Sequence, residues 1–220
     1  MSDHRWVTFD CFGTLIDWRH GIATLADLVS PGNGARLLAA YNRHEHQVQQ
    51  AEPTPRYRHV LTETLRRAAA EEKIDLADDD ADVLATGIPY WPVFPEVRQA
   101  LAELRAAGWN LALLTNCDRD IIGQTLRRLR VPFDATVTAE DAGAYKPAHN
   151  HFLRFRQSYE PAQWVHVAQS YFHDVIPAGE LGVRCIWVNR HGAPDDPALA
   201  HAVLPDLSGL PLALGVQPQD

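Results

Sequence analysis

The sequence predicts an α/β protein whose core is a parallel sheet with helices on both faces, interrupted early by a segment that is entirely helical. From about residue 95 onward, short apolar runs typical of strands alternate with amphipathic helical runs, which indicates a parallel sheet covered by helices. Between residues 17 and 92 this alternation is absent, and long helical stretches take its place. We therefore expect a core of residues 1–16 and 93–220 and a helical cap of residues 17–92.

The individual elements follow from apolar periodicity and from the residues that end each run. Residues 6–8 are a short β-prone run, and a proline-containing break separates helical stretches at 35–50 and 56–72. Gly108 and Gly182 end helices in the core, as glycine commonly does. In the core we expect helices at 96–107, 118–129, 150–157 and 176–181, and strands at 109–115, 135–138, 165–168 and 185–188, with an edge strand at 203–204.

Composition excludes several classes of protein. The 220 residues are 46% apolar, enough for one sizeable core, and the net charge of −8 gives no general attraction to nucleic acid or an anionic membrane surface. The three cysteines are an odd number without paired spacing, which fits a reducing compartment. No run approaches the ~18 apolar residues of a membrane span, and the N-terminus has no apolar signal region. We expect a soluble, cytoplasmic protein without nucleic-acid or membrane partners.

Reactive side chains stand at or just after the ends of the expected strands. Asp10 follows the first strand and precedes a tight Gly-Thr turn, where open α/β sheets hold their chemistry, so it is a candidate carboxylate nucleophile. Downstream, Thr115 and Asn116 end a second strand, Lys146 lies in a loop, and Asp174 follows a later strand.

This order of aspartate, threonine, lysine and aspartate resembles the four motifs of the haloacid dehalogenase-like superfamily, and the resemblance covers the whole chain. The resemblance implies a Rossmann-like core with an inserted helical cap. It also implies an active site between them, at the carboxyl ends of the strands.

Two positions distinguish the reactions found in that superfamily. Its phosphatases carry a second aspartate two residues after the nucleophile, where this chain has Phe12, and a phenyl ring cannot transfer a proton. They also place an acidic magnesium ligand after the fourth strand, at a position that aligns with Gln169, whereas magnesium prefers carboxylates. Because acid and metal ligand are both missing, we expect no metal and no cofactor.

The chain resembles the (S)-2-haloacid dehalogenases of the superfamily, which have an aromatic residue at the position of Phe12. A halide leaves as a stable anion and needs neither proton nor metal. The resemblance implies that Asp10 attacks C2 of a short 2-haloacid, a small anionic substrate, and that water hydrolyses the resulting ester to a 2-hydroxy acid.

The resemblance also implies a role for each further site residue. Lys146 lies beside Asp10, and Asp174 orients this lysine and helps to activate the hydrolytic water. Hydroxyl groups for Asp10 and the substrate carboxylate come from Thr14 and Thr115. The halide is faced by Asn116 and by Arg43 in the cap, and Tyr57 forms an aromatic wall. The substrate pocket is completed by Phe12, Gln169 and Tyr171.

Three positions depart from the dehalogenase pattern. Gln169 and Tyr171 stand where the family has serine and asparagine, and Phe152 replaces a tyrosine six residues after the lysine. These changes indicate either a dehalogenase subgroup with a different pocket or a homologue that acts on another anionic substrate.

Each assignment has a simpler alternative. Asp10 could be a turn aspartate, Lys146 a solvated loop cation, and Asp174 a helix cap. Arg43 could pair with a neighbour such as Glu45. Histidine pairs two residues apart, which could suggest zinc, point away from each other on a helix.

Two other functions remain open at this level. One is a magnesium-dependent phosphatase with an altered site, and the other is a non-catalytic homologue that keeps the fold. Trp18, Trp91 and the cap helices could also supply an apolar interface for a homodimer.

Overall fold

The computed structural model describes residues 5–51 and 55–217, which form two compact units. The first unit comprises the described residues of 1–16, 93–116 and 126–220, and the second those of 17–92 and 117–125. Residues 117–125, which we had expected in the core, therefore group with the helical segment. The view of the helical segment as a separate cap domain stays a prediction.

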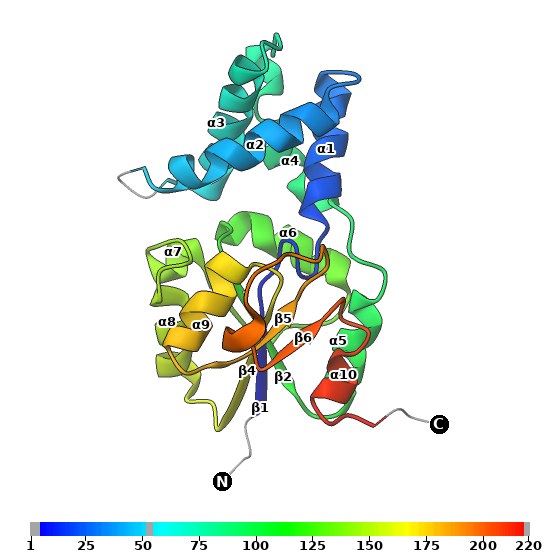
Figure 1. The fold of residues 1–220 in the computed structure, drawn as a ribbon, viewed down its shortest axis with the longest axis vertical. Coiled ribbons are helices and arrows are strands. Elements are labelled where there is room, and N and C mark those ends of the chain that lie inside the picture. Colours follow the sequence, from blue (N-terminus) through cyan, green and yellow to red (C-terminus); the bar gives the residue numbers. More distant parts are fainter. Residues whose placement is uncertain (1–4, 52–54, 218–220) are drawn as a thin grey trace. The chain divides into compact units, whose positions relative to one another are not determined.

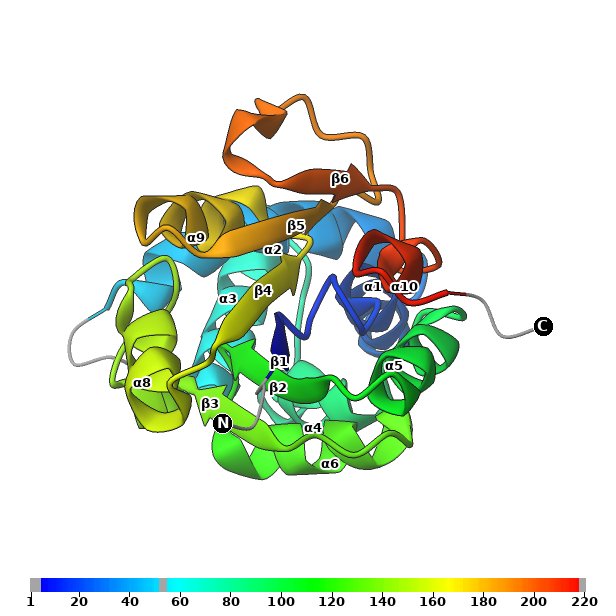
Figure 2. The same ribbon diagram turned by 90° about the horizontal axis from the view of Figure 1, so that it is seen from below.

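The first unit is built on one sheet of six parallel strands, which confirms the predicted α/β class. The spatial order is β3-β2-β1-β4-β5-β6, so β1 lies in the middle, and the chain builds outward from it in both directions (Figures 1 and 2). Such a reversal of strand order marks the place where open α/β sheets bind ligands. The strands are β1 (Arg5–Phe9), β2 (Asn110–Thr115), β3 (Ala135–Thr138), β4 (Gln163–Ala168), β5 (Arg184–Val188) and β6 (Ala202–Leu204).

Helices lie on both faces of this sheet (Figure 2). One face carries α8 (Asn150–Tyr159) and α9 (Ile176–Glu180), whose apolar side chains join those of the strands in a buried cluster. The opposite face carries α5 (Val97–Ala106) and the short α10 (Leu210–Ala213). Helix α7 (Ala139–Ala142) follows β3 directly and begins with a capping box formed by Thr138.

The second unit is helical, as predicted. It contains α1 (Trp18–Val29), α2 (Gly34–Gln49), α3 (Tyr57–Glu71) and α4 (Val83–Gly87), together with the first turns of α6 (Arg119–Leu129). Within the described residues, no helix has the length and apolar character needed to cross a membrane.

Asp118 explains why residues 117–125 belong to the helical unit. Its two carboxylate oxygens accept hydrogen bonds from the backbone N–H groups of Tyr57 and Arg58, at 2.9 and 3.0 Å. The first N–H groups of a helix have no partner inside the helix, and the helix dipole also stabilises a carboxylate at that end. Asp118 therefore caps α3 from a distant part of the sequence.

Two glycines in helices of the second unit give a stability prediction. A Cβ on Gly21 would lie 2.3 Å from the buried ring of Trp91, whereas a Cβ on Gly123 has no atom within 4 Å. We expect Gly21→Ala to lower the free energy of unfolding by about 1–3 kcal/mol through overpacking. Gly123→Ala, the matched control, should raise it by about 0.5–1 kcal/mol because alanine favours the helix. Urea denaturation measures both values, and equal effects of the two substitutions would contradict this packing.

Candidate active site

Asp10 lies directly after the central strand, with its backbone fixed by the neighbouring strand. Its N–H donates to the carbonyl of Val167 at 3.1 Å, and Gly13 turns the chain with a φ of +100° that favours glycine. The turn returns Thr14 to Asp10, where the threonine Oγ1 donates to Oδ2 at 2.9 Å. Thr14 Oγ1 in turn accepts the N–H of Gln169 at 2.9 Å. The nucleophile candidate is thus held from both sides, with only 7% of its surface exposed.

Lys146 joins the two predicted acids. Its Nζ lies 2.9 Å from Asp10 Oδ1 and 2.6 Å from Asp174 Oδ1, and 2.8 Å from the carbonyl oxygen of Leu114. An ammonium group has three hydrogens, so these contacts use all of them. The lysine is buried, which excludes the alternative of a solvated loop cation.

The mutual arrangement of these groups sets their charges. Burial raises the pKa of Asp10 above its usual value, although Lys146 and Thr14 oppose this rise. Burial also acts to raise the pKa of Asp174, but Lys146 and His166 lower it by more, so this carboxyl stays ionised. For Lys146, burial opposes the charged form, yet the two carboxylates outweigh it and raise the pKa above its ordinary value. With both carboxyls ionised, the three groups sum to a charge of −1.

Asn116 positions the loop that carries the lysine. Its Oδ1 accepts the N–H of Lys146 at 2.7 Å, and its Nδ2 donates to the carbonyl of the same residue at 3.1 Å. Both ends of the amide therefore fix the backbone from which the ammonium reaches Asp10. A contact between Asn116 and a halide stays a prediction.

Asp174 is set in place by a short π-helical turn, Tyr171–Val175, that follows β4. The side chain of Ser170 accepts the N–H of His173 and begins this turn. Asp174 Oδ1 then receives hydrogen bonds from Lys146 and from His166 Nε2, the latter at 3.0 Å. Such turns occur often at functional sites.

Two buried oxygens at this end of the sheet have no hydrogen-bond partner among the described residues. They are Oδ2 of Asp174 and Oγ1 of Thr115. Buried polar atoms are nearly always paired, and a catalytic role or a bound molecule is one explanation for those that are not. The predicted Thr115 therefore has an uncommitted hydroxyl, at the end of the strand beside β1.

Other predicted residues are committed elsewhere. Tyr171 donates its phenol proton to the carbonyl of Asp196 at 2.6 Å, and its ring packs on Trp187, so its role in a substrate pocket has no support in the structure. Gln169 takes part through its backbone: its carbonyl accepts the Trp187 indole N–H at 3.0 Å. Phe12 is half-buried in the turn after β1 and forms an isolated bridge to Ile16.

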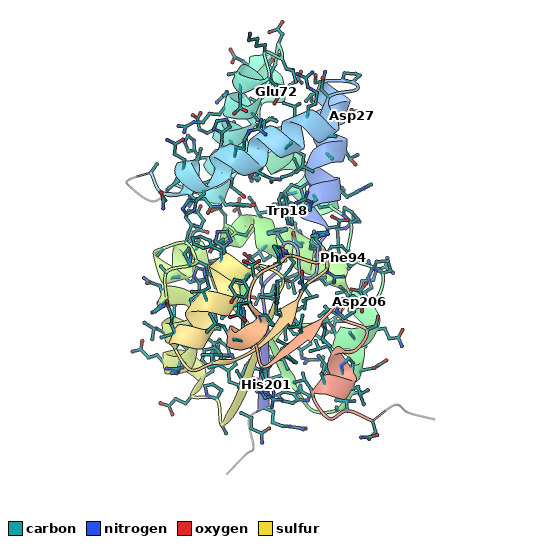
Figure 3. All side chains as sticks on the ribbon, viewed as in Figure 1. Trp18, Asp27, Glu72, Phe94, His201 and Asp206 are labelled. Carbon is teal, nitrogen blue, oxygen red and sulfur yellow. The ribbon has the colours of Figure 1, made fainter. Side chains whose placement is uncertain are left out.

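Arg43 and Tyr57 belong to the helical unit. The guanidinium of Arg43 pairs with Glu71 and with Glu72, whose place at the end of α3 is labelled in Figure 3. Because two carboxylates already compensate its charge, the halide-facing role of Arg43 has no support in the structure. Its partners also differ from Glu45, the neighbour suggested by helix spacing. Tyr57 is buried at the start of α3, and its place as an aromatic wall stays a prediction.

Comparison with known proteins identifies the family. A family described as haloacid dehalogenase-like hydrolase matches residues 4–176. The chain belongs to the haloacid dehalogenase-like hydrolases.

Relatives in this family carry two kinds of name. The chain is 25% identical over 202 residues to haloacetate dehalogenase H-2 of Moraxella sp. (strain B), covering 87% of this chain and 88% of the relative. It is 29% identical over 227 residues to phosphoglycolate phosphatase of Pseudomonas putida, covering 94% of this chain and 78% of the relative. The crystal structure of an L-2-haloacid dehalogenase has a TM-score of 0.84 at 23% identity and covers 97% of this chain and all of that one (100%), so the fold is shared.

Sequence reasoning missed two residues of this hydrolase that support the site. His166 binds Asp174 from inside β4, and a lone histidine in an apolar strand was the available signal. Arg190 lies just after β5, where its guanidinium donates to the carbonyl of Thr14 at 2.8 Å and to Glu96 at 2.6 Å. It also lies over the ring of Phe94, labelled in Figure 3. A polar residue just after a strand end was the signal here.

The site does not fit a magnesium ion of the phosphatase kind. The position two residues after Asp10 carries a phenyl ring, and the position after β4 carries the neutral amide of Gln169. The carboxylates of Asp10 and Asp174 are both bound by Lys146 Nζ. A hard dication that favours carboxylate oxygens therefore has too few charged ligands in this donor set.

The buried lysine gives a prediction with a defined pH dependence. Lys146→Met leaves two buried carboxylates without their shared cation, which should cost about 3–5 kcal/mol of unfolding free energy near neutral pH. Without the ammonium, the pKa of both carboxyls rises in the folded variant, so its native state binds more protons than its unfolded state. Stability of the variant should therefore recover as the pH falls from about 7.5 to about 5.

Chemical denaturation at both pH values tests this expectation. In the wild type, Asp174 has a lowered pKa, so its contribution to stability is complete above the pKa of the unfolded carboxyl and is lost only on further acidification. Lys73→Met, at the exposed second lysine, is the control and should change little at either pH. A loss that is equal at both pH values would contradict the charge argument.

Proposed function

We propose that this hydrolase is a metal-independent dehalogenase of short 2-haloacids, with Asp10 as its nucleophile. The observation that carries the proposal is a buried carboxylate held by Lys146 and Thr14 at the end of the central strand, with Phe12 where a phosphatase needs an acid. A carboxylate held in this way is oriented for attack. Because residue 12 provides no acid, the reaction that fits best has a leaving group that needs no proton. The names of several relatives agree with this chemistry.

In the first half-reaction, one oxygen of Asp10 attacks C2 of the substrate from the side opposite the halogen. The carbon–halogen bond breaks with both electrons on the halide, and an ester between Asp10 and the substrate forms. The charge of the nucleophile passes to the halide, so no proton moves in this step. Lys146 and Thr14 fix the attacking carboxylate, which supplies orientation.

In the second half-reaction, water attacks the carbonyl carbon of the Asp10 ester. Asp174 accepts a proton from the water and returns it to the departing alkoxide, which leaves as the 2-hydroxy acid. Asp10 then loses its carboxyl proton to solvent. The unpartnered Oδ2 of Asp174 supports this assignment, because its other oxygen is already occupied by two donors.

Recognition of an anionic substrate needs donors, since Asp10, Lys146 and Asp174 together are negative. Thr115 has a buried hydroxyl free of other partners among the described residues, and we assign it to the substrate carboxylate. Arg43 pairs with two glutamates, so we do not assign it to the substrate carboxylate. A comparison of 2-chloropropionate with its neutral amide therefore measures how strongly the site prefers an anion.

The phosphoglycolate phosphatase of Pseudomonas putida supports a second candidate, a magnesium-dependent phosphatase. This alternative requires another group to supply the proton that Phe12 cannot and the charge that Gln169 lacks. It predicts release of phosphate that stops when EDTA removes the metal.

The first prediction for this function concerns halide release. Purified protein given chloroacetate, fluoroacetate or racemic 2-chloropropionate should release halide at the same rate with and without EDTA. Asp10→Asn should lower the rate by at least about a thousandfold, because a neutral amide is not a nucleophile. Asp206→Asn, at a carboxylate that accepts the N–H of Ser208 at 2.8 Å, is the matched control and should retain the activity. EDTA-sensitive phosphate release without any halide would instead support the phosphatase.

The second prediction traces the oxygen. In a single turnover with excess enzyme in ¹⁸O-labelled water, the hydroxyl oxygen of the product comes from Asp10 and should be unlabelled. The label should appear in the peptide that contains Asp10, detected by mass spectrometry after proteolysis. Labelled product in the first turnover would mean that water attacks the substrate directly, which would overturn the ester intermediate.

A further inference from the structure

His166 is a polar side chain in a position where burial lowers the stability of the fold. It lies on β4, paired in register with Thr8 of β1 and Cys185 of β5, and its side chain is fully buried. The surrounding face of the sheet is apolar and is covered by α8 and α9. An imidazole in such a place costs stability unless both nitrogens have partners, and an aliphatic side chain would pack there without that cost.

Both nitrogens of His166 do have partners, and their chemistry assigns the hydrogens. Asp174 is ionised and can only accept, so Nε2 of His166, 3.0 Å from its Oδ1, must carry a hydrogen. Nδ1 lies 2.9 Å from Thr8 Oγ1, which itself accepts the indole N–H of Trp164 at 2.9 Å. A hydroxyl that accepts from the indole can donate its own hydrogen to Nδ1. The chain of contacts therefore aims the imidazole N–H at the carboxylate.

Packing fixes the plane of the ring as well. The ring of Phe152 on α8 lies edge to face with His166, with centroids 4.9 Å apart and planes at 75°. Thr8, Phe152 and Asp174 come from three different elements, so His166 is restrained on several sides. A side chain held in this way can orient the carboxylate that it contacts.

We propose that His166 is a positioning residue for the hydrolytic half-reaction, which turns Asp174 so that Oδ2 receives the proton of the attacking water. This inference rests on the proposed dehalogenase function and deepens it. Lys146 cannot fix the carboxylate alone, because its three hydrogens are shared among Asp10, Asp174 and Leu114. His166 is the second donor to Oδ1 of Asp174. Its hydrogen bond fixes the rotation of the carboxylate about the Cβ–Cγ bond and leaves Oδ2 unpaired.

The two half-reactions depend differently on this contact. Formation of the ester and loss of halide need Asp10 and its donors, and Asp174 takes up no proton in that step. Cleavage of the ester needs Asp174 to take a proton from water and to return it to the alkoxide. Loss of the His166 contact should therefore slow the second step and spare the first.

The test compares two substitutions at residue 166 with the wild type, using 2-chloropropionate. His166→Phe keeps a planar ring but removes the donor, and we expect a burst of one halide per site, followed by turnover reduced about ten- to a hundredfold, as for a lost hydrogen bond to a charged group. Intact-protein mass spectrometry should show the ester, mapped to the peptide containing Asp10. His166→Gln retains an N–H at the ε position and should recover most of the turnover without accumulation of ester.

Further variants separate positioning from packing. Cys185→Ala disturbs the buried neighbour of His166 on β5 and should not change the ratio of the two steps. Thr8→Val removes the hydroxyl that holds Nδ1 and should accumulate ester to a smaller extent, which keeps the inference testable if His166→Phe does not fold. Thermal unfolding of each variant reports its stability.

The outcomes are distinct. The positioning role alone would be overturned if the wild type releases halide while His166→Phe slows both steps equally and forms no ester. If His166→Phe does not fold, a Thr8→Val variant whose ratio of the two steps equals that of the wild type would also overturn the positioning role. Wild-type protein that releases no halide from any haloacid would overturn the dehalogenase function and this inference with it.

Discussion

The candidate site depends on one constraint, a single buried ammonium that must neutralise two buried carboxylates. Lys146 meets this demand with all of its hydrogens, so each carboxylate needs a second donor of its own. Thr14 provides it for Asp10, and His166 provides it for Asp174. Removing one partner from such a group leaves an uncompensated charge in a low dielectric, which is strongly destabilising. Several segments of the core are therefore tied to one nitrogen atom.

Much of the fold and the centre of the site could be predicted from the sequence because both depend on local pattern. The alternation of strands and helices after residue 95 determines the parallel sheet, and strand ends then bring Asp10, Thr14, Lys146 and Asp174 to one edge. These positions need no knowledge of distant packing. The pairing of the lysine with its two acids was implied by the resemblance to the haloacid dehalogenase-like superfamily, and the structure has both ion pairs.

The rest of the site depends on partners that are remote in sequence. Arg43 has its guanidinium on the acids at the end of α3 rather than on Glu45, because packing of α2 against α3 decides which charges meet. Tyr171 reaches the carbonyl of Asp196 in the same way. His166 interrupts an apolar strand, yet its role could be inferred only after Thr8 and Asp174 were seen beside it.

Arg190 has a consequence for which parts of the chain hold the reactive turn. It lies beyond residue 176, where the family match ends, and still it binds the carbonyl of Thr14 in the turn that carries the nucleophile. Glu96 holds the same guanidinium from the start of α5. A residue beyond the matched range therefore also helps to hold the reactive turn. A scaffold that received the four motifs without the end of the fifth strand would leave the Thr14 carbonyl without its hydrogen bond from Arg190.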